Sequence, residues 1–398
     1  MIDISNIFLN DTYRKLIDNG RTYASFTTDE LKIIFNERST FNDKILDPMS
    51  GYGGLMNHCN PLSISTINLE LNLPAYYWQI LVNPCNKSIY EELIHILLES
   101  KKNKYPKIRI KAKASDNWFT NEGLDLTKKL LTFVQNNLAI IGCNNFEISI
   151  ALLLPFVKRL STCITGDITH LKKGGITVFE NWEYDFLTYL KALQENRLNH
   201  INQNESTHKT YLGDIRNFAF PEKYSLVVTS PPYPNYRDYY KMFAPENFFL
   251  ENLGIKTMPT AIIGSNVIKG RFKGAISSEI ALKFLKELED YKGSKKASND
   301  IKVYYLPYFH NYFSDIESSC NNIILHLNRS AVCYFSIVNN ATRNFTIPVA
   351  QVIEEIFKKR GFQSEYVSNK EVFHVGTKNP NSRGLKAKHN KFLIKLWR

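Results

Sequence analysis

The hydrophobic positions of this chain alternate between short β-branched runs and longer stretches with helical spacing. A short apolar run ends at Leu46 and leads into the Gly-rich segment DPMSGYGG at 47–54, and the β-branched run SISTINLEL carries Glu70 near its end. A strand, a Gly-rich turn, a gap of helix length and a second strand with a terminal acid form the outline of a nucleotide-binding βαβ unit. The pattern therefore predicts an α/β protein with such a unit near its start.

Helical spacing dominates between residues 75 and 200, which predicts a helical insertion into the α/β core. Before the Gly-rich turn, TTDELKIIFNE predicts a helix with Thr27 or Thr28 as its cap. The segment 293–300 is predicted to be a loop. Further strands are predicted in YLGDI, YSLVVTS, AVCYFSIVNN and the final KFLIKLWR, and a further helix is predicted at 349–361.

Composition adds a large core and a basic surface to this picture. With 43% hydrophobic residues the chain can bury a large core, and its length of 398 residues suits two or three compact units. Lys and Arg number 50 against 38 Asp and Glu, a formal net charge of +12. This surplus predicts a polyanionic partner such as nucleic acid, although a lysine-rich, low-GC genome produces the same surplus. Basic residues gather in 101–113, 269–273 and 378–398, where phosphate contacts are the expected use and a solvated surface is the alternative.

Several classes of protein are excluded by what the sequence lacks. The six cysteines are dispersed without a CxxC pair or a zinc-type spacing, which predicts neither a disulfide framework nor a metal site. No stretch approaches the ~20 apolar residues of a membrane span, and the first residues do not form a signal-peptide pattern. We therefore expect a cytoplasmic protein that binds no metal and no membrane.

The segment TSPPY at 229–233 directly follows a buried-strand pattern and carries the candidate chemistry. Two prolines force a rigid, extended turn, which would hold Ser230 Oγ and the Pro231 carbonyl side by side as two acceptors. Two such acceptors suit an exocyclic amine, because accepting from both N–H groups favours a pyramidal nitrogen whose lone pair points at an incoming methyl group. Tyr233 would stack on a base that has been rotated out of its helix.

In this order, DPMSGYGG, NLEL, LGDI and TSPPY resemble the motifs of the amino-group DNA methyltransferases that use S-adenosylmethionine, especially the N4-cytosine type with an SPPY motif. The resemblance covers most of the chain and includes a restriction-modification subgroup. It implies a Rossmann-like class I methyltransferase core with a mixed, mostly parallel seven-stranded sheet, plus a helical insertion. The core would comprise 20–85, 205–260 and 326–398, with the insertion at 86–200 and a variable, target-recognising segment at 261–325.

The resemblance also implies residue roles. Asp47 would organise the first loop near the methionine part of the cofactor, and Glu70 would accept hydrogen bonds from the ribose hydroxyls. Asp214 would accept from the adenine amino group, with Ile215 packed on the ring. Phe26 and Thr27 match an additional cofactor motif, although a helix cap beside a core aromatic explains them equally well. The expected cofactor contacts are Phe26, Thr27, Asp47, Pro48, Ser50, Gly51, Gly53, Glu70, Asp214 and Ile215, and the expected catalytic residues are Ser230, Pro231, Pro232 and Tyr233.

The expected activity is methyl transfer from S-adenosylmethionine to the N4 amine of a flipped cytosine at a specific site in double-stranded DNA. The resemblance adds a cognate restriction endonuclease acting on the same site. The alternatives are an N6-adenine methyltransferase, a methyltransferase acting on RNA, and a non-catalytic DNA-binding protein with a decayed cofactor fold. Pro84-Cys85 is similar to the nucleophile pair of C5-cytosine methyltransferases, but its place before LGDI favours an ordinary cysteine. Asp238 is a further candidate for contact with the base.

Overall fold

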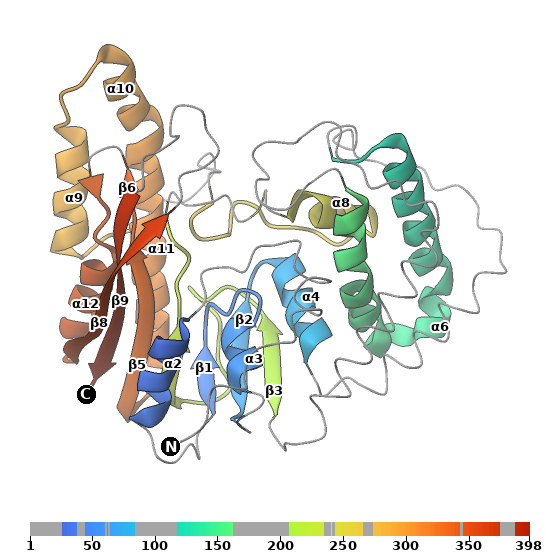
Figure 1. The fold of residues 1–398 in the computed structure, drawn as a ribbon, viewed down its shortest axis with the longest axis horizontal. Helices are drawn as coiled ribbons and strands as arrows, with labels where there is room; N and C mark the ends of the chain where they lie inside the picture. Colours follow the sequence, from blue (N-terminus) through green and yellow to red (C-terminus); the bar gives the residue numbers. More distant parts are fainter. Residues whose placement is uncertain are drawn as a thin grey trace.

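A seven-stranded sheet forms the centre of the molecule (Figure 1). The structure is a computed structural model. It describes residues 26–37, 44–59, 62, 64–83, 118–161, 207–234, 240, 243–265, 274–342, 345–374 and 387–398. In spatial order the strands are β3 (His208–Leu212), β2 (Thr66–Glu70), β1 (Ile45–Asp47), β4 (Tyr224–Thr229), β5 (Leu327–Asn339), β9 (Ala387–Trp397) and β8 (Gln363–His374).

The sheet is mixed and mostly parallel. The pairs β3–β2, β2–β1, β1–β4 and β4–β5 are parallel, whereas β9 runs antiparallel to both of its neighbours, β5 and β8. Parallel neighbours need crossover connections, which accounts for the helices between successive strands. The predicted Rossmann-like fold class is therefore confirmed.

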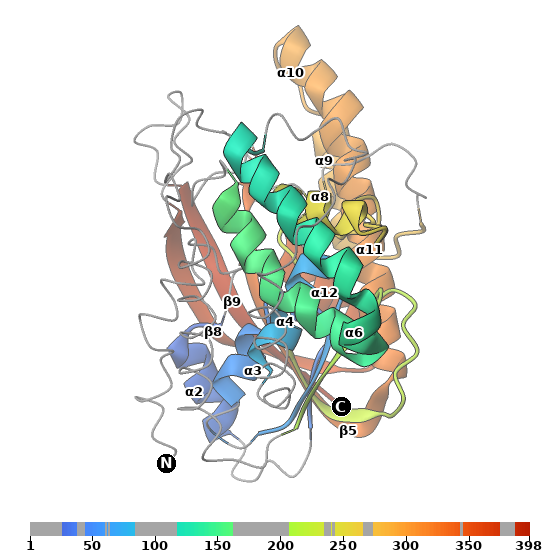
Figure 2. The ribbon, with the colours of Figure 1, turned by 90° about the vertical axis from the view of Figure 1, so that its right-hand side faces the viewer.

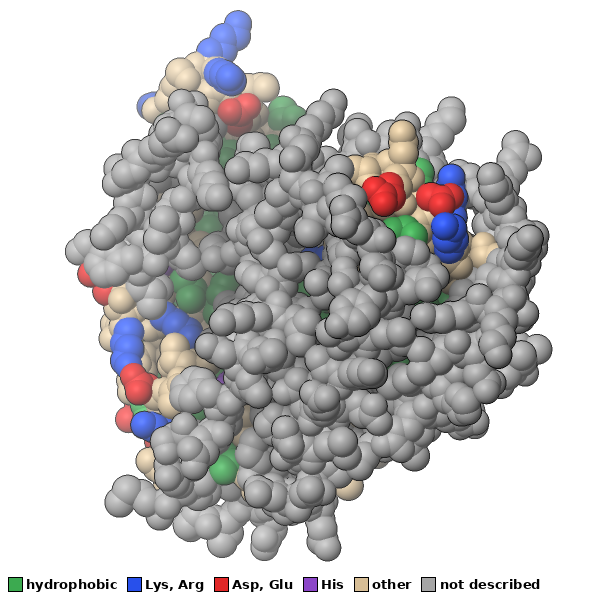
Figure 3. All heavy atoms as spheres, turned by 45° about the vertical axis from the view of Figure 1, so that its right-hand side comes forward, with side chains coloured by type: hydrophobic (Ala, Val, Ile, Leu, Met, Phe, Trp, Pro, Cys, Tyr) green, Lys and Arg blue, Asp and Glu red, His purple; other side chains and the backbone are tan. Residues whose placement is uncertain are grey.

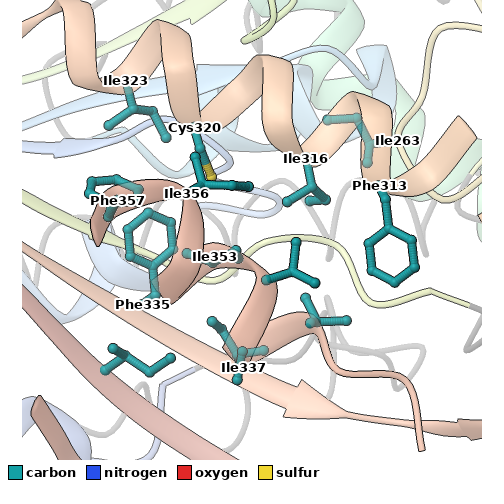
Figure 4. Close-up of a cluster of buried hydrophobic side chains, with 14 of the residues drawn as sticks. Ile263, Phe313, Ile316, Cys320, Ile323, Phe335, Ile337, Ile353, Ile356 and Phe357 are labelled. Carbon is teal, nitrogen blue, oxygen red and sulfur yellow. The ribbon is translucent and has the colours of Figure 1, made fainter. Parts of the chain in front are cut away.

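Helices cover both faces of this sheet. On β4, Leu226 and Val228 pack on one face with α2 (Thr28–Asn36) and α3 (Gly54–Cys59), while Val227 between them packs on the other. Successive strand residues point to opposite faces, so an apolar run such as this one is buried on both sides. The opposite face carries α9 (Glu279–Glu289), α11 (Leu306–Leu325) and α12 (Val349–Lys358), and Figure 4 shows side chains of α11, α12 and β5 in one buried cluster.

The segment predicted as a helical insertion, 86–200, comes after α4 (Leu73–Val82) in the chain, and its boundaries stay predictions. Its element α6 (Asn121–Leu160) folds back on itself, because Phe119 and Ser161 at its two ends form an antiparallel bridge (Figure 2). It shares an apolar cluster with α4 and with α8 (Ala244–Asn252). This cluster lies beside the sheet rather than on its central strands.

Residues 293–300 are not the predicted loop. They contain α10 (Lys295–Asp300), whose N-cap is Ser294, and the Ser294 Oγ accepts a hydrogen bond from the Ala297 N–H. A π-helical turn, η6 (Ile301–Tyr305), joins α10 to α11. The N-cap serine was the sequence signal for this helix, and the polar GSKKASND composition obscured it.

The two remaining strands, β6 (Ala341–Thr342) and β7 (Phe345–Thr346), form a small separate ribbon. In Figure 1, β1 and β3 point toward the edge of the sheet above which α8 and α10 lie. The carboxyl ends of the parallel strands thus face the part of the molecule between these helices. None of the helices in the described ranges is long and apolar enough to cross a membrane.

Candidate active site

The candidate site begins where β1 and β4 lie side by side at the centre of the sheet. Strand order reverses here, with β2 and β3 on one side and β5 on the other, and such a switch point is where α/β proteins bind ligands. Asp47 ends β1 and Thr229 ends β4, and Thr229 Oγ1 donates a 2.7 Å hydrogen bond to Asp47 Oδ1. Burial raises the pKa of the Asp47 carboxyl to about 7, although the Thr229 hydroxyl and the Met49 N–H favour its charged form.

The Gly-rich loop after β1 is held closely against β2 and α4. Ser50 Oγ donates to the Leu69 carbonyl at 3.0 Å, and Gln79 Nε2 donates to Ser50 Oγ at 2.7 Å and to the Gly51 carbonyl at 2.6 Å. Gly51 and Gly53 have φ angles of 54° and 74°, which only glycine adopts readily. A Cβ on Gly53 would lie 3.0 Å from Gln79 Cγ. The two glycines therefore permit both the shape of the loop and its close approach to α4.

Gln79 is a site residue that the sequence interpretation missed. It lies in the apolar run YYWQILV and is fully buried. Buried amides are uncommon and need partners, so a single glutamine in an apolar helical run was the available signal. Gln79 Oε1 also accepts from Thr210 Oγ1 of β3 at 3.2 Å, which connects the loop to a third strand.

Glu70 lies at the end of β2, beside the same loop. Its Oε1 accepts from the N–H groups of Leu71 at 3.0 Å and Asn72 at 2.7 Å, and the Gly51 N–H also bonds the carboxylate. Burial and, to a smaller extent, the nearby charge of Asp47 raise the pKa of Glu70 to about 7, although these three donors favour its charged form. Two carboxyl groups thus lie together at the β1 and β2 ends, where an added cation would favour ionisation of both.

Asp214 follows β3 and is engaged by a residue that the sequence interpretation missed. Arg216 donates from Nε to Asp214 Oδ1 at 2.9 Å and from Nη2 to Oδ2 at 2.5 Å. The same guanidinium reaches Asp315 Oδ1 on α11 at 2.6 Å and the Ala261 carbonyl at 2.7 Å. Both oxygens of Asp214 therefore have a partner, and a contact with an adenine amino group would use their remaining lone pairs or displace Arg216.

The TSPPY segment follows β4 and is fixed from two sides. Tyr312 Oη of α11 donates to the Pro232 carbonyl at 2.9 Å, and Asn340 Nδ2 donates to the Pro234 carbonyl at 3.1 Å. Ser230 Oγ lies 3.1 Å from Tyr233 Oη. The Tyr233 side chain is 2% exposed, so stacking of its ring on a base stays a prediction that requires the ring to be uncovered.

Of the remaining predicted cofactor residues, Phe26, Pro48 and Ile215 are buried, whereas Thr27 is exposed. Thr27 is the N-cap of α2, and its hydroxyl and the Glu30 carboxylate form a reciprocal capping box. Phe26 belongs to the apolar cluster under α2, Ile215 to the one under α11, and Pro48 is buried after β1. These placements fit the structural explanation of Phe26 and Thr27, and their contacts with a cofactor stay predictions.

Several predictions lie outside the described residues. These are the basic segments 101–113 and 269–273, Cys85 and Asp238. The described part of the third basic segment is β9, where Lys391 Nζ lies 2.7 Å from Glu30 Oε2 and Lys395 pairs with Glu37. These two lysines bind α2 to the sheet, which is a structural use that the charge count did not indicate.

No group of His, Cys, Asp and Glu in the described part of the chain is arranged to hold a metal ion. Cys59, Cys320 and Cys333 are buried cysteines outside disulfides. Burial raises the pKa of the Cys59 and Cys320 thiols. Raised thiol pKa values disfavour the nucleophilic thiolate, so these two cysteines suit packing rather than chemistry.

Comparison with known proteins adds little to this geometry. No family model and no curated protein matches the chain. Two solved structures of the rRNA methyltransferase aviRa from Streptomyces viridochromogenes align with 99% of this chain and 93% of their own, at 8% identity and a TM-score of 0.33. A likeness this low carries no weight for function, and the fold assignment rests on the strand order and direction given above.

Proposed function

We propose that this chain is a site-specific DNA methyltransferase that transfers a methyl group from S-adenosylmethionine to the N4 amine of a flipped cytosine in double-stranded DNA. We further propose that it works in a restriction-modification system with a cognate endonuclease. The observation that carries the proposal is the hydrogen bond from Thr229 to Asp47. It joins the residue before Ser230 to the start of the Gly-rich loop. Group transfer needs donor and acceptor within about 3–3.5 Å, and this contact brings the two candidate binding elements together.

The residues around the Gly-rich loop fit S-adenosylmethionine. The cofactor supplies, when bound, an electrophilic methyl group on a positively charged sulfur. Asp47 and Glu70 are acidic groups whose ionised forms a cation would stabilise. A carboxylate offers about four lone-pair positions, so three N–H contacts leave Glu70 able to accept from a ribose hydroxyl. Gly51 and Gly53 present backbone without side chains at the loop.

The TSPPY segment supplies the proposed amine site. Ser230 Oγ has two lone pairs, so it can accept from Tyr233 Oη and from an amine N–H at the same time. The Pro231 carbonyl would accept from the second N–H. Accepting both bonds draws the nitrogen lone pair out of conjugation with the base ring, and the nitrogen releases one proton to solvent after the methyl group has arrived.

A basic surface on the same side of the sheet supports a DNA partner. Lys292, Lys295 and Lys296 are exposed at the outer end of the hairpin formed by α9 and α11. Figure 3 shows basic side chains at this end, with an acidic side chain beside them, and Figure 1 places α10 above the edge toward which β1 points. Lysines at this position suit phosphate groups, whose neutralisation supplies much of the affinity of a protein for DNA.

The proposal is tested by two measurements on matched variants. Calorimetry should show binding of S-adenosylmethionine to the wild type and to Ser230→Ala. Methylation of duplex DNA should be lost in Ser230→Ala and retained in Ser225→Ala, because Ser225 lies at the opposite end of β4 and bonds Asn328 instead. The proposal fails if the wild type does not bind S-adenosylmethionine, or if Ser230→Ala and Tyr233→Ala leave methylation unchanged.

A further inference from the structure

One helix, α11, contacts both halves of the candidate site. Tyr312 Oη donates to the Pro232 carbonyl of the proposed amine site at 2.9 Å. Asp315, three residues further along, binds Arg216 Nη1 at 2.6 Å. Residues three apart lie on the same side of a helix. A single turn of α11 thus holds the segment after β4 and, through Arg216, the loop after β3.

The contact with Pro232 fixes the direction of the proposed acceptor carbonyl. Proline has no N–H, so the backbone at Pro231 and Pro232 can form hydrogen bonds only through its carbonyls. The orientation of the Pro231 carbonyl relative to the Pro232 carbonyl depends on φ and ψ of Pro232. The pyrrolidine ring fixes φ, and the bond from Tyr312 restrains ψ by fixing the Pro232 carbonyl. The Tyr312 hydroxyl therefore helps to set where the Pro231 carbonyl points.

The contact with Arg216 fixes the loop after β3 in the same way. Arg216 binds Asp214 through Nε and Nη2, while its other contacts, Asp315 and the Ala261 carbonyl, lie on separate elements. The guanidinium is a planar group with five donors, so its position is set by the acceptors around it. Any shift of Asp315 would therefore move Arg216 and, with it, Asp214.

The helix is suited to transmit such a constraint. Five of its side chains, Phe309, Phe313, Ile316, Cys320 and Ile323, are essentially fully buried against the sheet and α12, and Figure 4 shows four of them in this packing. Close-packed helices move as rigid bodies rather than bending locally. Tyr312 and Asp315 cannot readily change their separation while this face remains packed.

We propose that α11 is a rigid bridge that sets the position of the TSPPY segment relative to the loop after β3, which carries Asp214, with Tyr312 and Arg216 as positioning residues. The inference rests on the proposed function, because methyl transfer is sensitive to the distance between the methyl donor and the accepting amine. A displacement of about 1 Å is enough to slow such a reaction by roughly 100-fold.

The test compares two tyrosines on this helix. Tyr308 and Tyr312 are both buried, and each donates its hydroxyl to a backbone carbonyl, Tyr308 to that of Gly264 at 3.2 Å. Tyr312→Phe and Tyr308→Phe therefore remove one equivalent hydrogen bond each. We expect similar melting temperatures and similar Kd values for S-adenosylmethionine, but a kcat on duplex DNA reduced about 10-fold to 100-fold in Tyr312→Phe alone. Equal kcat values in the two variants, with an active wild type, would overturn the bridge and leave the proposed function intact.

A second measurement, hydrogen exchange, tests the proposed bridge without using catalysis. Pro231, Pro232 and Pro234 have no N–H, so Tyr233 supplies the single backbone amide of PPYP. S-adenosylmethionine should slow hydrogen exchange of the Tyr233 amide in the wild type and in Tyr308→Phe, and should not slow it in Tyr312→Phe or Asp315→Asn. Cofactor binding without this difference overturns the bridge, even if DNA is not methylated. If S-adenosylmethionine does not bind, the proposed function fails, and the bridge fails with it.

Discussion

Thr229 and Asp47 are 182 positions apart in the chain, and the Thr229 hydroxyl donates a 2.7 Å hydrogen bond to the buried Asp47 carboxylate. The contact joins the carboxyl ends of β4 and β1 at the point where strand order reverses. Everything proposed for the site is arranged around it, because the Gly-rich loop leaves from Asp47 and TSPPY begins at Thr229.

Replacing Thr229 by valine should weaken this junction. The change keeps the shape of the side chain and removes the donor, so the pKa of Asp47 should rise above about 7, since the hydroxyl at present favours the charged form. A buried acceptor left without its partner costs about 1–3 kcal/mol in the free energy of unfolding. Calorimetry at pH 7.5 should show weaker binding of S-adenosylmethionine. Thr66→Val is the control, because the Thr66 hydroxyl bonds His208, and the account is contradicted if both variants bind the cofactor equally.

Stability should fall as the pH rises toward neutrality. The Asp47 and Glu70 carboxyls have ordinary pKa values of 3.8 and 4.5, and both are raised to about 7 in the folded chain, chiefly by burial. Between the ordinary pKa values and about 7, the folded state holds protons that the unfolded state has released. The stability that these bound protons contribute at low pH is therefore lost as the pH rises through about 7. Denaturant unfolding from pH 5 to 8 should show this decline.

Asp47→Asn should flatten this pH dependence, because an amide retains the acceptor for Thr229 and cannot ionise. The wild type should also release protons when it binds S-adenosylmethionine near pH 7, since a cation favours the charged carboxylates. Calorimetry in buffers of different ionisation enthalpy measures that release. The same change of stability from pH 5 to 8 in the wild type and in Asp47→Asn would show that the Asp47 carboxyl is not perturbed.

Gly53→Ala should destabilise the Gly-rich loop more than its backbone angle alone explains. Gly53 has φ of +74°, and a Cβ there would lie 3.0 Å from Gln79 Cγ and 3.1 Å from Met56 Cε. Gly254 has φ of +84° with no atom within 4 Å, so Gly254→Ala introduces a similar backbone strain without the crowding. Melting temperatures should therefore fall further for Gly53→Ala, which should also bind S-adenosylmethionine more weakly. Equal melting temperatures would mean that contact with Gln79 does not matter.

Lys391→Met should destabilise the fold strongly. It removes one partner of the buried Glu30–Lys391 pair, which typically costs about 3–5 kcal/mol because the other charge is left uncompensated. Lys358→Met removes the exposed partner of Glu354 and should cost about 0–1 kcal/mol. Urea unfolding measures both, and the double variant Glu30→Gln with Lys391→Met should recover much of the loss. A small loss of stability in Lys391→Met would contradict this structural role and favour the predicted use of Lys391 in phosphate contacts.

The sequence allowed the framework of the site to be predicted, because local patterns determine it. Buried apolar runs indicate β1, β2 and β4. The residues that end these strands, Asp47, Glu70 and Thr229, belong to the candidate site. The edge strand β8 was missed, since QSEYVSNKEVFH has no continuous apolar run.

The supporting contacts could not be predicted in this way. Arg216 meets Asp315 at a separation of 99 residues, and Tyr312 meets Pro232 at a separation of 80. Such pairs depend on how α11 packs across the sheet, and nothing in the local sequence around either partner encodes the distance between them. Arg216 in particular changes the environment of Asp214, which motif spacing alone had presented as an open acceptor.

The most direct test of the central claim is the identity of the methylated nucleoside. Duplex DNA is incubated with the protein and S-adenosylmethionine that carries a deuterated methyl group, then digested and analysed by mass spectrometry. We predict deuterated N4-methyl-2′-deoxycytidine with the wild type and none with Ser230→Ala. Label found only in N6-methyl-2′-deoxyadenosine, or in no nucleoside at all, would contradict the account.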